Sequence, residues 1–195
     1  GLAIGFHFPF GNKLMGVQEN SFKPNSFINV MPDNKIIVSV AKAEMGQGVW
    51  TSLPMLIAEE MDLDWEKIKV IQSSESGLSG GTGGSMSING YGWKKMRKSG
   101  AIARHALIEA AALTWKVNPL ECKTRNGTVI HEKSRKEAKY GSLVKKASAL
   151  KLPKKVKLKN PSEFNIIGKE KLRIDSKIKV DGTAIFGMDK NLKNM

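Results

Sequence analysis

The chain is almost without cysteine, and that absence excludes several kinds of site. Its 195 residues include one cysteine, Cys122, which is too few for a disulfide framework or a four-cysteine zinc or iron–sulfur site within the chain. The three histidines, His7, His105 and His131, are widely spaced, and none has a partner at metal-ligand spacing. We therefore predict no metal ligands, and we expect Cys122 to be a small buried residue.

Long apolar runs and acidic residues are also scarce. No stretch reaches the ~18 apolar residues of a transmembrane helix, so no transmembrane span is expected. Lysine and arginine total 32 against 18 acidic residues, which gives a formal net charge of +14. This balance suits nucleic acid or another acidic partner, an acidic membrane surface, or only a solvated lysine-rich surface. Because the lysines are spread along the chain, we favour the solvated surface, and nucleic acid is not favoured as a partner.

The beginning of the sequence, GLAIGFHFPFG at 1–11, is unusually apolar for an exposed terminus. It is similar to the end of the hydrophobic region of a secretory signal, which indicates a periplasmic location. The alternative is an apolar arm that packs on the domain or on a partner, and this leaves a cytoplasmic location open. Residues 11–25 are polar and predict a loop. We interpret residues 1–25 together as an export-signal remnant and linker.

The next segment combines strand and helix signals. Runs rich in β-branched residues predict three strands, of which the first two form a hairpin around a Pro-Asp-Asn turn: Phe27–Val30, Lys35–Val40 and Ile68–Gln72. Apolar residues at helical spacing predict a helix over 49–61. Pro54 is tolerated in this helix if Thr51 or Ser52 is its cap, and otherwise it introduces a kink.

The second half of the chain begins with a long helical pattern. Small and apolar residues predict a helix over 93–117, which Asn118-Pro119 ends. The pair Asn126-Gly127 is typical of a type I′ hairpin turn. Residues 141–150 predict a short amphipathic helix.

The remaining sequence predicts a connector and an incomplete unit. KLPKKVKLKNP at 151–161 is interpreted as a solvated basic connector, since it lacks the interleaved aromatics of a nucleic-acid groove. Residues 179–186 predict strands around an Asp-Gly turn. The predicted fold class is α+β: a small mixed sheet packed with two main helices, plus the start of a truncated second unit. The predicted divisions are the linker at 1–25, a main domain at 26–150, a basic connector at 151–175 and the second unit at 176–195.

Two glycine-rich segments carry the chemical signals. Gly46-Gln47-Gly48 stands directly before the first predicted helix, where the glycines serve either a tight turn or the close approach of a ligand. Between two glycines, the Gln47 amide meets little steric obstruction and offers two donors and an acceptor carbonyl. From these residues alone, a tight loop in an α+β domain is the stronger interpretation.

The second segment, SSESGLSGGTGGSMSINGYG at 73–92, is too rich in glycine and serine for a helix or central strand. It is neither a P-loop nor a dinucleotide fingerprint. A flexible linker is one interpretation, but long irregular loops inside a domain are often functional. Backbone N–H groups and two hydroxyls in Gly-Gly-Ser-Met-Ser, directly before a helix, suit an anion.

Several motifs in this order and spacing resemble one protein family. They include AEMGQGVWTSLPMLIAEEMDLDWEKIKVIQS, GGTGGSMSINGYGWKKMRKSGAIARHALIEAAALTW, NGTVIH, YGSLVKKASAL, FNIIGK and DSKIKVDGTAIFGMD. Together they are similar to the amino-terminal part of a molybdenum-hydroxylase large subunit of the isoquinoline 1-oxidoreductase beta-subunit type. That family belongs with the molybdopterin-binding subunits of xanthine dehydrogenase and aldehyde oxidase. The resemblance covers about residues 27–195.

The resemblance implies roles for particular residues. Gln47 matches the glutamine whose amide sits beside the molybdenum oxo group, and Gly46 and Gly48 match the glycines that let this loop reach the cofactor. Gly84, Ser85, Met86 and Ser87 match the segment that holds the pterin, and Gly83 directly before them is counted with the cofactor-binding residues. The implied cofactor is molybdopterin cytosine dinucleotide.

The resemblance also implies a reaction and partners. The reaction is hydroxylation of an N-heterocycle or an aldehyde, with water as the oxygen source. Electrons leave through [2Fe–2S] clusters on a separate small subunit, which agrees with the single cysteine here. The apolar start resembles the end of a twin-arginine signal, although the arginine pair is absent, and KVDGTAIFGMD resembles the entry into a hammerhead-like domain.

The sequence departs from the family in important respects. The family's large subunits are several times longer, and their general-base glutamate lies in a downstream Gly-rich segment that this sequence lacks. The expected protein is therefore part of an enzyme that needs the remainder of its large subunit and is not active alone. Two alternatives remain open: a nonenzymatic basic binding domain that retains the fold, and a fragment that folds poorly. The sequence identifies neither substrate, electron acceptor nor oligomeric state.

Overall fold

The structure is a computed structural model that describes residues 21–72 and 84–191. The apolar start at 1–20 and most of the second glycine-rich segment, including Gly83, lie outside the described residues. The export-signal interpretation therefore stays a prediction. Among the helices that are described, none combines the length and apolar character needed to cross a bilayer.

The larger sheet has four strands in the order β1-β2-β3-β4. Its strands are β1 Phe22–Asn25, β2 Ile28–Val30, β3 Ile36–Val40 and β4 Ile68–Gln72. The first three are antiparallel, whereas β3 and β4 are parallel, with Ile36 opposite Ile68. This arrangement confirms the predicted hairpin, the predicted third strand and the mixed character of the sheet.

The predicted loop over 11–25 is wrong at its end, because Phe22–Asn25 forms strand β1. Phe22 is buried in the core and pairs with Val30. Pro24 concealed this strand in the sequence, since proline removes a backbone donor. A proline is tolerated here because β1 is an edge strand, where one face of the backbone needs no ladder partner.

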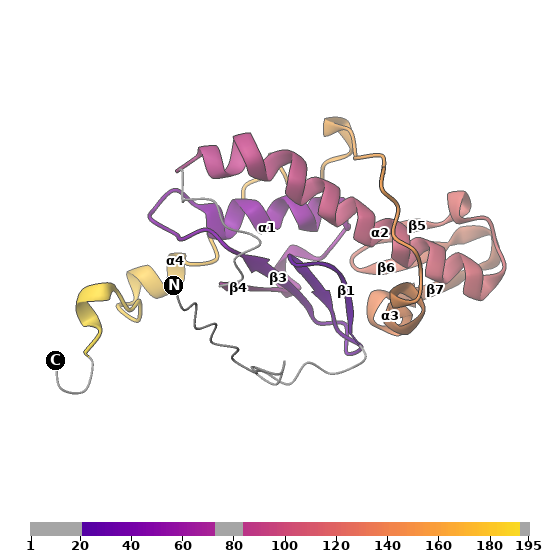
Figure 1. Ribbon diagram of the computed structural model, residues 1–195, viewed down its shortest axis with the longest axis horizontal. Coiled ribbons are helices and arrows are strands. Elements are labelled where there is room, and N and C mark those ends of the chain that lie inside the picture. Colours follow the sequence, from indigo (N-terminus) through magenta and orange to yellow (C-terminus); the bar gives the residue numbers. More distant parts are fainter. Residues whose placement is uncertain (1–20, 73–83, 192–195) are drawn as a thin grey trace, which may run out of the picture.

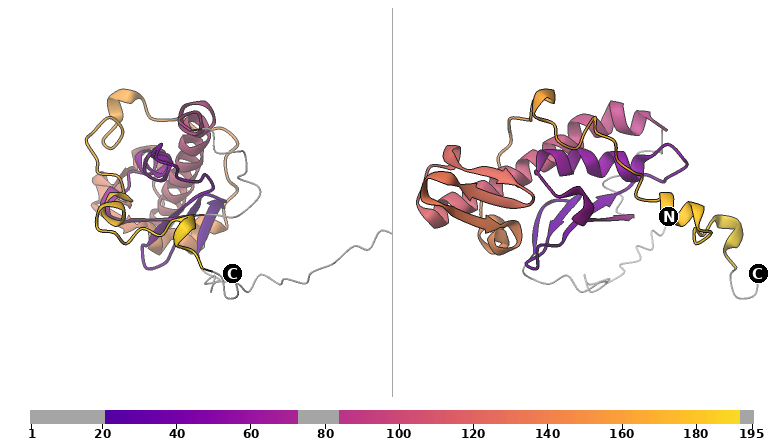
Figure 2. Two further views of the ribbon diagram at one scale, coloured as in Figure 1. Left: turned by 90° about the vertical axis from the view of Figure 1, so that its left-hand side faces the viewer. Right: turned by 180° about the vertical axis from the view of Figure 1, so that it is seen from behind.

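Two long helices, α1 Val49–Glu60 and α2 Trp93–Trp115, cover the same face of this sheet (Figures 1 and 2). Both were predicted from apolar periodicity. Helix α1 forms the crossover between the parallel strands β3 and β4, as such a connection requires. Leu53, Ile57 and Leu107 are among the buried side chains between the layers, and burial of each contributes about 1.5–3 kcal/mol.

The start of α1 differs from the prediction. Gly48 is its N-cap and has a left-handed φ of 85°, so neither Thr51 nor Ser52 caps the helix. Pro54 consequently lies beyond the first turn. The expected hydroxyl cap is wrong because the Glu44 carboxylate accepts hydrogen bonds from the N–H groups of Gly48 and Trp50 at the start of the helix.

The smaller sheet is antiparallel in the order β5-β6-β7, with strands Lys123–Arg125, Thr128–His131 and Lys136–Lys139. Asn126 and Gly127 have φ values of 48° and 70°, the positive pair that a type I′ turn requires. Helix α3, Tyr140–Ser148, follows β7 and confirms the predicted amphipathic helix. The buried Tyr140 hydroxyl donates to the Met61 carbonyl at 2.7 Å. This bond links the start of α3 to the C-cap residue of α1.

The described residues also form short helical turns: η1 Trp65–Lys67, the π-helix η3 Ser87–Gly92, η4 Pro119–Glu121, η5 Glu132–Ser134, η6 Pro161–Glu163 and η7 Gly187–Asp189. Cys122 follows η4 and is buried, as predicted. Burial raises the pKa of its thiol. The thiol is therefore neutral near pH 7 and behaves as a small apolar group.

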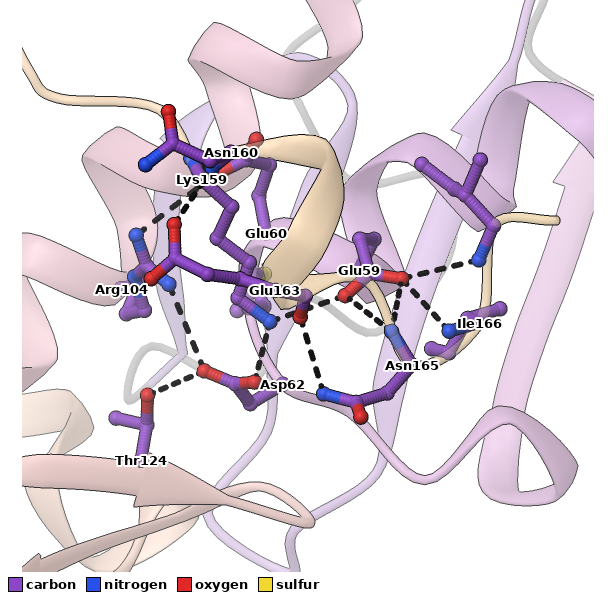
Figure 3. A network of polar contacts seen from close by, with 12 residues as sticks. Glu59, Glu60, Asp62, Arg104, Thr124, Lys159, Asn160, Glu163, Asn165 and Ile166 are labelled. Carbon is purple, nitrogen blue, oxygen red and sulfur yellow. Dashed lines mark hydrogen bonds and ion pairs between the residues drawn. The ribbon is translucent and has the colours of Figure 1, made fainter. Parts of the chain in front are cut away.

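A buried ionic cluster joins the predicted connector to the end of α1 (Figure 3). Lys159 Nζ lies 3.0 Å from Glu59 Oε1 and 2.5 Å from Asp62 Oδ1. The Lys159 side chain is only 7% exposed. The prediction of a solvated connector is therefore wrong at this residue, because its charge is neutralised by carboxylates from a distant helix.

The neighbouring acid, Glu60, pairs with cations from α2. Arg97 Nη2 lies 2.7 Å from Glu60 Oε1, and Arg104 Nη2 lies 3.7 Å from Glu60 Oε2. The Arg97 guanidinium is also 5.0 Å from the ring centroids of both Trp93 and Phe164. The connector, α1 and α2 are thus held together by charge pairs and aromatic contacts at one place.

The Glu59 carboxylate also binds the backbone that follows the connector. Its Oε2 accepts hydrogen bonds from the N–H groups of Asn165, Ile166 and Ile167 at 3.0, 2.7 and 3.0 Å. Burial alone raises the pKa of Glu59, but these hydrogen bonds and the Lys159 ammonium outweigh it and hold the pKa below its usual value. Residues 159–167, which we call the strap, are therefore fixed against α1.

The final described segment contains helix α4, Ser176–Val180, and extends away from the body of the molecule (Figure 1). The strands predicted over 179–186 are wrong, because the helix occupies their first residues. The Asp-Gly turn is nevertheless present: Gly182 has a φ of 78°, and Asp181 Oδ1 accepts from the Thr183 N–H at 3.0 Å. The α+β fold class is confirmed, and the domain divisions stay a prediction.

Candidate cofactor-binding site

The first glycine motif lies in the loop at 41–48, between the carboxyl end of β3 and helix α1. In sheets with parallel strands, ligands bind where such loops leave the carboxyl ends of the strands. Gly46 and Gly48 have φ values of 104° and 85°, and a Cβ at either position would meet nothing within 4 Å. These glycines are therefore needed for a left-handed backbone rather than for space.

Glu44 organises this loop from within. Its Oε1 accepts from the N–H groups of Gly46 and Gly48 at 2.8 and 3.0 Å, and its Oε2 accepts from Trp50 at 3.1 Å. The carboxylate thus takes the place of the missing side-chain cap of α1. Burial alone raises the pKa of Glu44, but the three N–H groups and Arg173 outweigh it and lower the pKa.

Gln47 is half-buried. Its Nε2 donates to the Ala43 carbonyl at 2.9 Å, and its Oε1 accepts from the Met45 N–H at 2.6 Å. An amide nitrogen has two N–H donors and an amide oxygen has two lone pairs. Each atom therefore keeps the capacity for one further hydrogen bond to a ligand.

Arg173, from the segment before α4, reaches the same loop. Its Nη1 donates to the Gly46 carbonyl at 3.0 Å, and its Nη2 donates to Glu44 Oε1 at 3.0 Å. Asp175 accepts from Arg173 Nε and Nη2 at 3.1 and 3.0 Å. Sequence reasoning missed Glu44 and Arg173 as site residues. Glu44 stands inside the recognised motif, but nothing local in the sequence pairs it with a residue so far downstream.

An open groove of about 700 Å³ lies beside the loop. Its walls come from the loop, the start of α1, the end of β4 and the segment at 175–186. They include Met45, Trp50, Ile178, Ile185 and Phe186. The Trp50 indole N–H donates to Gln72 Oε1 at 2.8 Å, which fixes one wall. The groove is mainly apolar with charged groups at its edge, as small-molecule sites commonly are.

The second glycine motif is described from Gly84 onward. Gly84 has a φ of 55°, and its carbonyl accepts from the Ser87 N–H at 3.2 Å, so a turn leads directly into η3 and then α2. Ser85 and Met86 are exposed, whereas Ser87 is buried. The N–H groups of Ser87 and Ile88 already donate to the carbonyls of Gly84 and Ser85. The exposed Ser85, at the start of the helical stretch, presents a hydroxyl that suits an anionic ligand.

The two motifs lie at the same end of the molecule (Figures 1 and 2). Gly46, Gln47 and Gly48 are adjacent in one loop, and η3 packs against α1 near Leu53. In the part of the chain that is described, the groove is lined by residues of the first motif and by none of Gly84–Ser87. Ser87 instead lines a small apolar cavity with Val40 and Leu53. The shared use of both motifs therefore stays a prediction.

Residues 2–184 match a protein family described as the molybdopterin cofactor-binding domain. The chain is 33% identical over 96% of its length to a protein of Gluconacetobacter polyoxogenes named membrane-bound aldehyde dehydrogenase [pyrroloquinoline-quinone]. It is 29% identical over 88% of its length to the isoquinoline 1-oxidoreductase subunit beta of Brevundimonas diminuta. The chain spans 25% and 27% of the lengths of these two relatives.

A solved structure has a similar fold. Quinoline 2-oxidoreductase from Pseudomonas putida 86 superposes with a TM-score of 0.51 at 16% identity, covering 60% of this chain and 15% of that one. At this identity the likeness concerns the fold alone.

Proposed function

Because the chain belongs to the molybdopterin cofactor-binding domain family, we propose that it is the amino-terminal part of a molybdenum hydroxylase large subunit. The proposed reaction is hydroxylation of an N-heterocycle or an aldehyde with water as the oxygen source. The names of the two relatives, an isoquinoline oxidoreductase and an aldehyde dehydrogenase, support these substrate classes. Since the chain spans about a quarter of each relative, the reaction needs the remainder of the subunit.

The loop at 41–48 supplies one side of the proposed cofactor site. Gly46 and Gly48 fold the loop back on itself, and Gln47 stands between them with capacity for a further hydrogen bond on each amide atom. When bound, the molybdopterin cofactor supplies the oxidation chemistry. The role of Gln47 is to donate a hydrogen bond and to orient what lies beside its amide.

Residues Gly83 to Ser87 supply the other side, which holds the pterin and its phosphates. The turn at Gly84 and the exposed Ser85 stand at the start of the helical stretch formed by η3 and α2. Backbone N–H groups at a helix start attract phosphate oxygens. This segment suits phosphate oxygens, and the form of the cofactor that the family resemblance implies, molybdopterin cytosine dinucleotide, is the one we propose.

The test of this function is the variant Gln47→Ala in the full, cofactor-loaded subunit. Losing one ligand-orienting group typically costs about 10–100-fold in activity, so we expect a fall of that order in kcat. Unfolding temperature should stay nearly unchanged, because Gln47 is half-buried and bonds only within its own loop. Gln47→Glu keeps the size but removes the N–H donor, and it should not restore the rate. Full activity in Gln47→Ala would exclude the proposed role.

Cofactor analysis provides an independent test. One relative's name gives pyrroloquinoline quinone instead of a molybdenum cofactor. Metal analysis and pterin fluorescence of the purified full subunit should detect about one molybdenum and one pterin per chain. A bound quinone with neither molybdenum nor pterin would contradict the proposal.

We extend the proposal to partners, location and domain divisions. The [2Fe–2S] clusters lie on a small partner subunit, as the family resemblance implies, and the single cysteine of this chain agrees with that placement. The apolar start supports a periplasmic location. The unit at 26–150 binds the cofactor, 151–175 connects, and 176–195 begins a hammerhead-like domain. Co-purification of the two subunits from a periplasmic extract would support the first two points.

A nonenzymatic basic binding domain is the alternative, and the net charge of +14 favours it. It requires association with an acidic partner that weakens steeply as salt rises. Gel-shift titrations with duplex DNA at two salt concentrations separate the alternatives. The molybdenum hydroxylase proposal expects no specific shift at physiological salt.

A further inference from the structure

The loop that carries Gln47 is held from a segment more than a hundred residues away in the sequence. Arg173 Nη1 binds the carbonyl of Gly46, which directly precedes Gln47, across a sequence separation of 127 residues. The next residue, Ile174, donates its backbone N–H to Thr51 Oγ1 in the first turn of α1 at 3.1 Å. Residues 173–174 therefore contact both ends of the Gly46–Thr51 stretch.

The orientation of the Arg173 guanidinium is set by several bonds at once. One edge binds Gly46 and Glu44, while Asp175 accepts two hydrogen bonds from Nε and Nη2. Asp175 is 3% exposed and also lies 2.5 Å from Lys179 Nζ. A planar guanidinium makes such two-pronged contacts, whereas the ammonium of lysine does not.

These contacts differ from an ordinary surface ion pair. Exposed pairs contribute little because water and salt screen them. Here the Glu44 and Asp175 side chains are 10% and 3% exposed, although Arg173 itself is 38% exposed. Glu44 in turn accepts the N–H groups of Gly46, Gly48 and Trp50. Arg173 therefore binds the Glu44 carboxylate from outside, and Glu44 in turn binds the backbone on both sides of Gln47.

We infer that Arg173, held by Asp175, is a positioning residue that sets the conformation of the Gln47 loop in the assembled enzyme. The assignment of a cofactor contact to Gln47 rests on the proposed function, whereas the effect of Arg173 on the loop does not. The segment at 173–179 thus couples the site to the part of the chain that follows the strap. A change in that segment alters the placement of the Gln47 amide without touching the cofactor.

Hydrogen exchange tests the effect on the loop directly. In Arg173→Gln, the amides of Gly46, Gly48 and Trp50 should exchange at least about tenfold faster, because Glu44 and the Gly46 carbonyl lose charged partners. Amides in the middle of α2 should keep their rates. Lys177→Gln, which removes an exposed cation from the same segment, is the matched control. Asp175→Asn should produce a smaller change in the same amides, since Arg173 is present but less firmly held.

Kinetics of the full, cofactor-loaded subunit test whether the effect of Arg173 on the loop changes the rate of the proposed reaction. Arg173→Gln should lower kcat about tenfold or more at unchanged molybdenum content, and Arg173→Lys should recover only part of it. Unchanged loop exchange in Arg173→Gln would overturn the inference, as would faster exchange with an unchanged kcat. If exchange and kcat respond to Arg173 but Gln47→Ala is fully active, the proposed role of Gln47 fails while the effect of Arg173 on the loop stands.

Discussion

Three carboxylates stand out at the scale of single residues, because each neutralises backbone or cationic groups that would otherwise be costly to bury. Glu44 accepts the N–H groups at the start of α1, and Glu59 accepts those of the strap. Asp175 receives Arg173 and Lys179. Each acts only in its ionised form, so acid should weaken all three contacts.

Asp175 gives the most specific pH prediction. Burial alone raises its pKa, but hydrogen bonds from Arg173 and Lys179 outweigh burial and lower the pKa from 3.8 to about 2. A lowered folded-state pKa stabilises the fold above the ordinary value, and the contribution disappears as pH falls from about 4 toward 2. Because both cations are partly exposed, we expect the ionised Asp175 to contribute about 1–2 kcal/mol to the free energy of unfolding.

Urea unfolding of the chain and of Asp175→Asn checks this expectation. The variant should be less stable by that amount at pH 6, and the difference should shrink between pH 4 and pH 2. An equal difference at both pH values would contradict an ionic origin.

At the scale of elements, the pairing of α1 with α2 depends on a small residue at their closest approach. A Cβ on Gly100 would lie 2.9 Å from the Ile57 carbonyl oxygen and 3.0 Å from the Glu60 Cβ. The Ile57 backbone in a packed helix cannot move aside as the end of a flexible side chain can, so an added Cβ would push the two helices apart. The approach of the two helices therefore sets the geometry of Glu60 and its arginine partners as well.

Gly100→Ala should destabilise the chain despite the better helix propensity of alanine, which favours it by about 1 kcal/mol. Overpacking against a fixed backbone costs about 1–3 kcal/mol, so we expect a net loss in the free energy of unfolding. Gly187→Ala is the matched control, because a Cβ there meets nothing within 4 Å. Chemical unfolding of both variants measures the difference, and a stabilised Gly100→Ala would show that the helices move apart readily.

The elements that could be predicted from sequence have local signals. The hairpin at β2–β3, the helices α1 and α2, and the Asn126-Gly127 turn each follow from periodicity or turn chemistry within a short window. Strand β1 was missed because Pro24 hides it, and α4 was missed because its β-branched residues resemble a strand.

The candidate site could be predicted only in part for the same reason. Gln47 and its glycines are recognisable as a motif, and their loop has the tight left-handed turns that glycine permits. The contact of Arg173 with the loop and the burial of Lys159 depend on contacts between segments 100 or more residues apart. No local pattern encodes such pairs, so sequence reasoning placed these residues in a connector or a solvated surface.

At the scale of the whole molecule, contacts with Glu59 and Asp62 hold the strap against the end of α1 (Figure 3). Lys159→Met removes the charge that serves Glu59 and Asp62 but keeps much of the side-chain volume. Leaving buried carboxylates without their cation costs about 3–5 kcal/mol. We expect that loss in urea unfolding, together with faster exchange of the Asn165, Ile166 and Ile167 amides.

Lys155→Met, in the exposed part of the same connector, is the control and should be nearly neutral. A small effect of Lys159→Met on stability, with slow exchange at 165–167, would mean that the Glu59 backbone contacts hold the strap without the lysine.

The strap also has a consequence for synthesis on the ribosome. Glu59 finds its lysine 100 residues later and its backbone donors 106 to 108 residues later. While the nascent polypeptide is shorter than this, the Glu59 carboxylate lacks its cation and its hydrogen-bond donors, so its burial is unfavourable. We expect the domain to remain sensitive to protease during translation until roughly residue 167 has left the exit tunnel, and to become resistant soon afterwards.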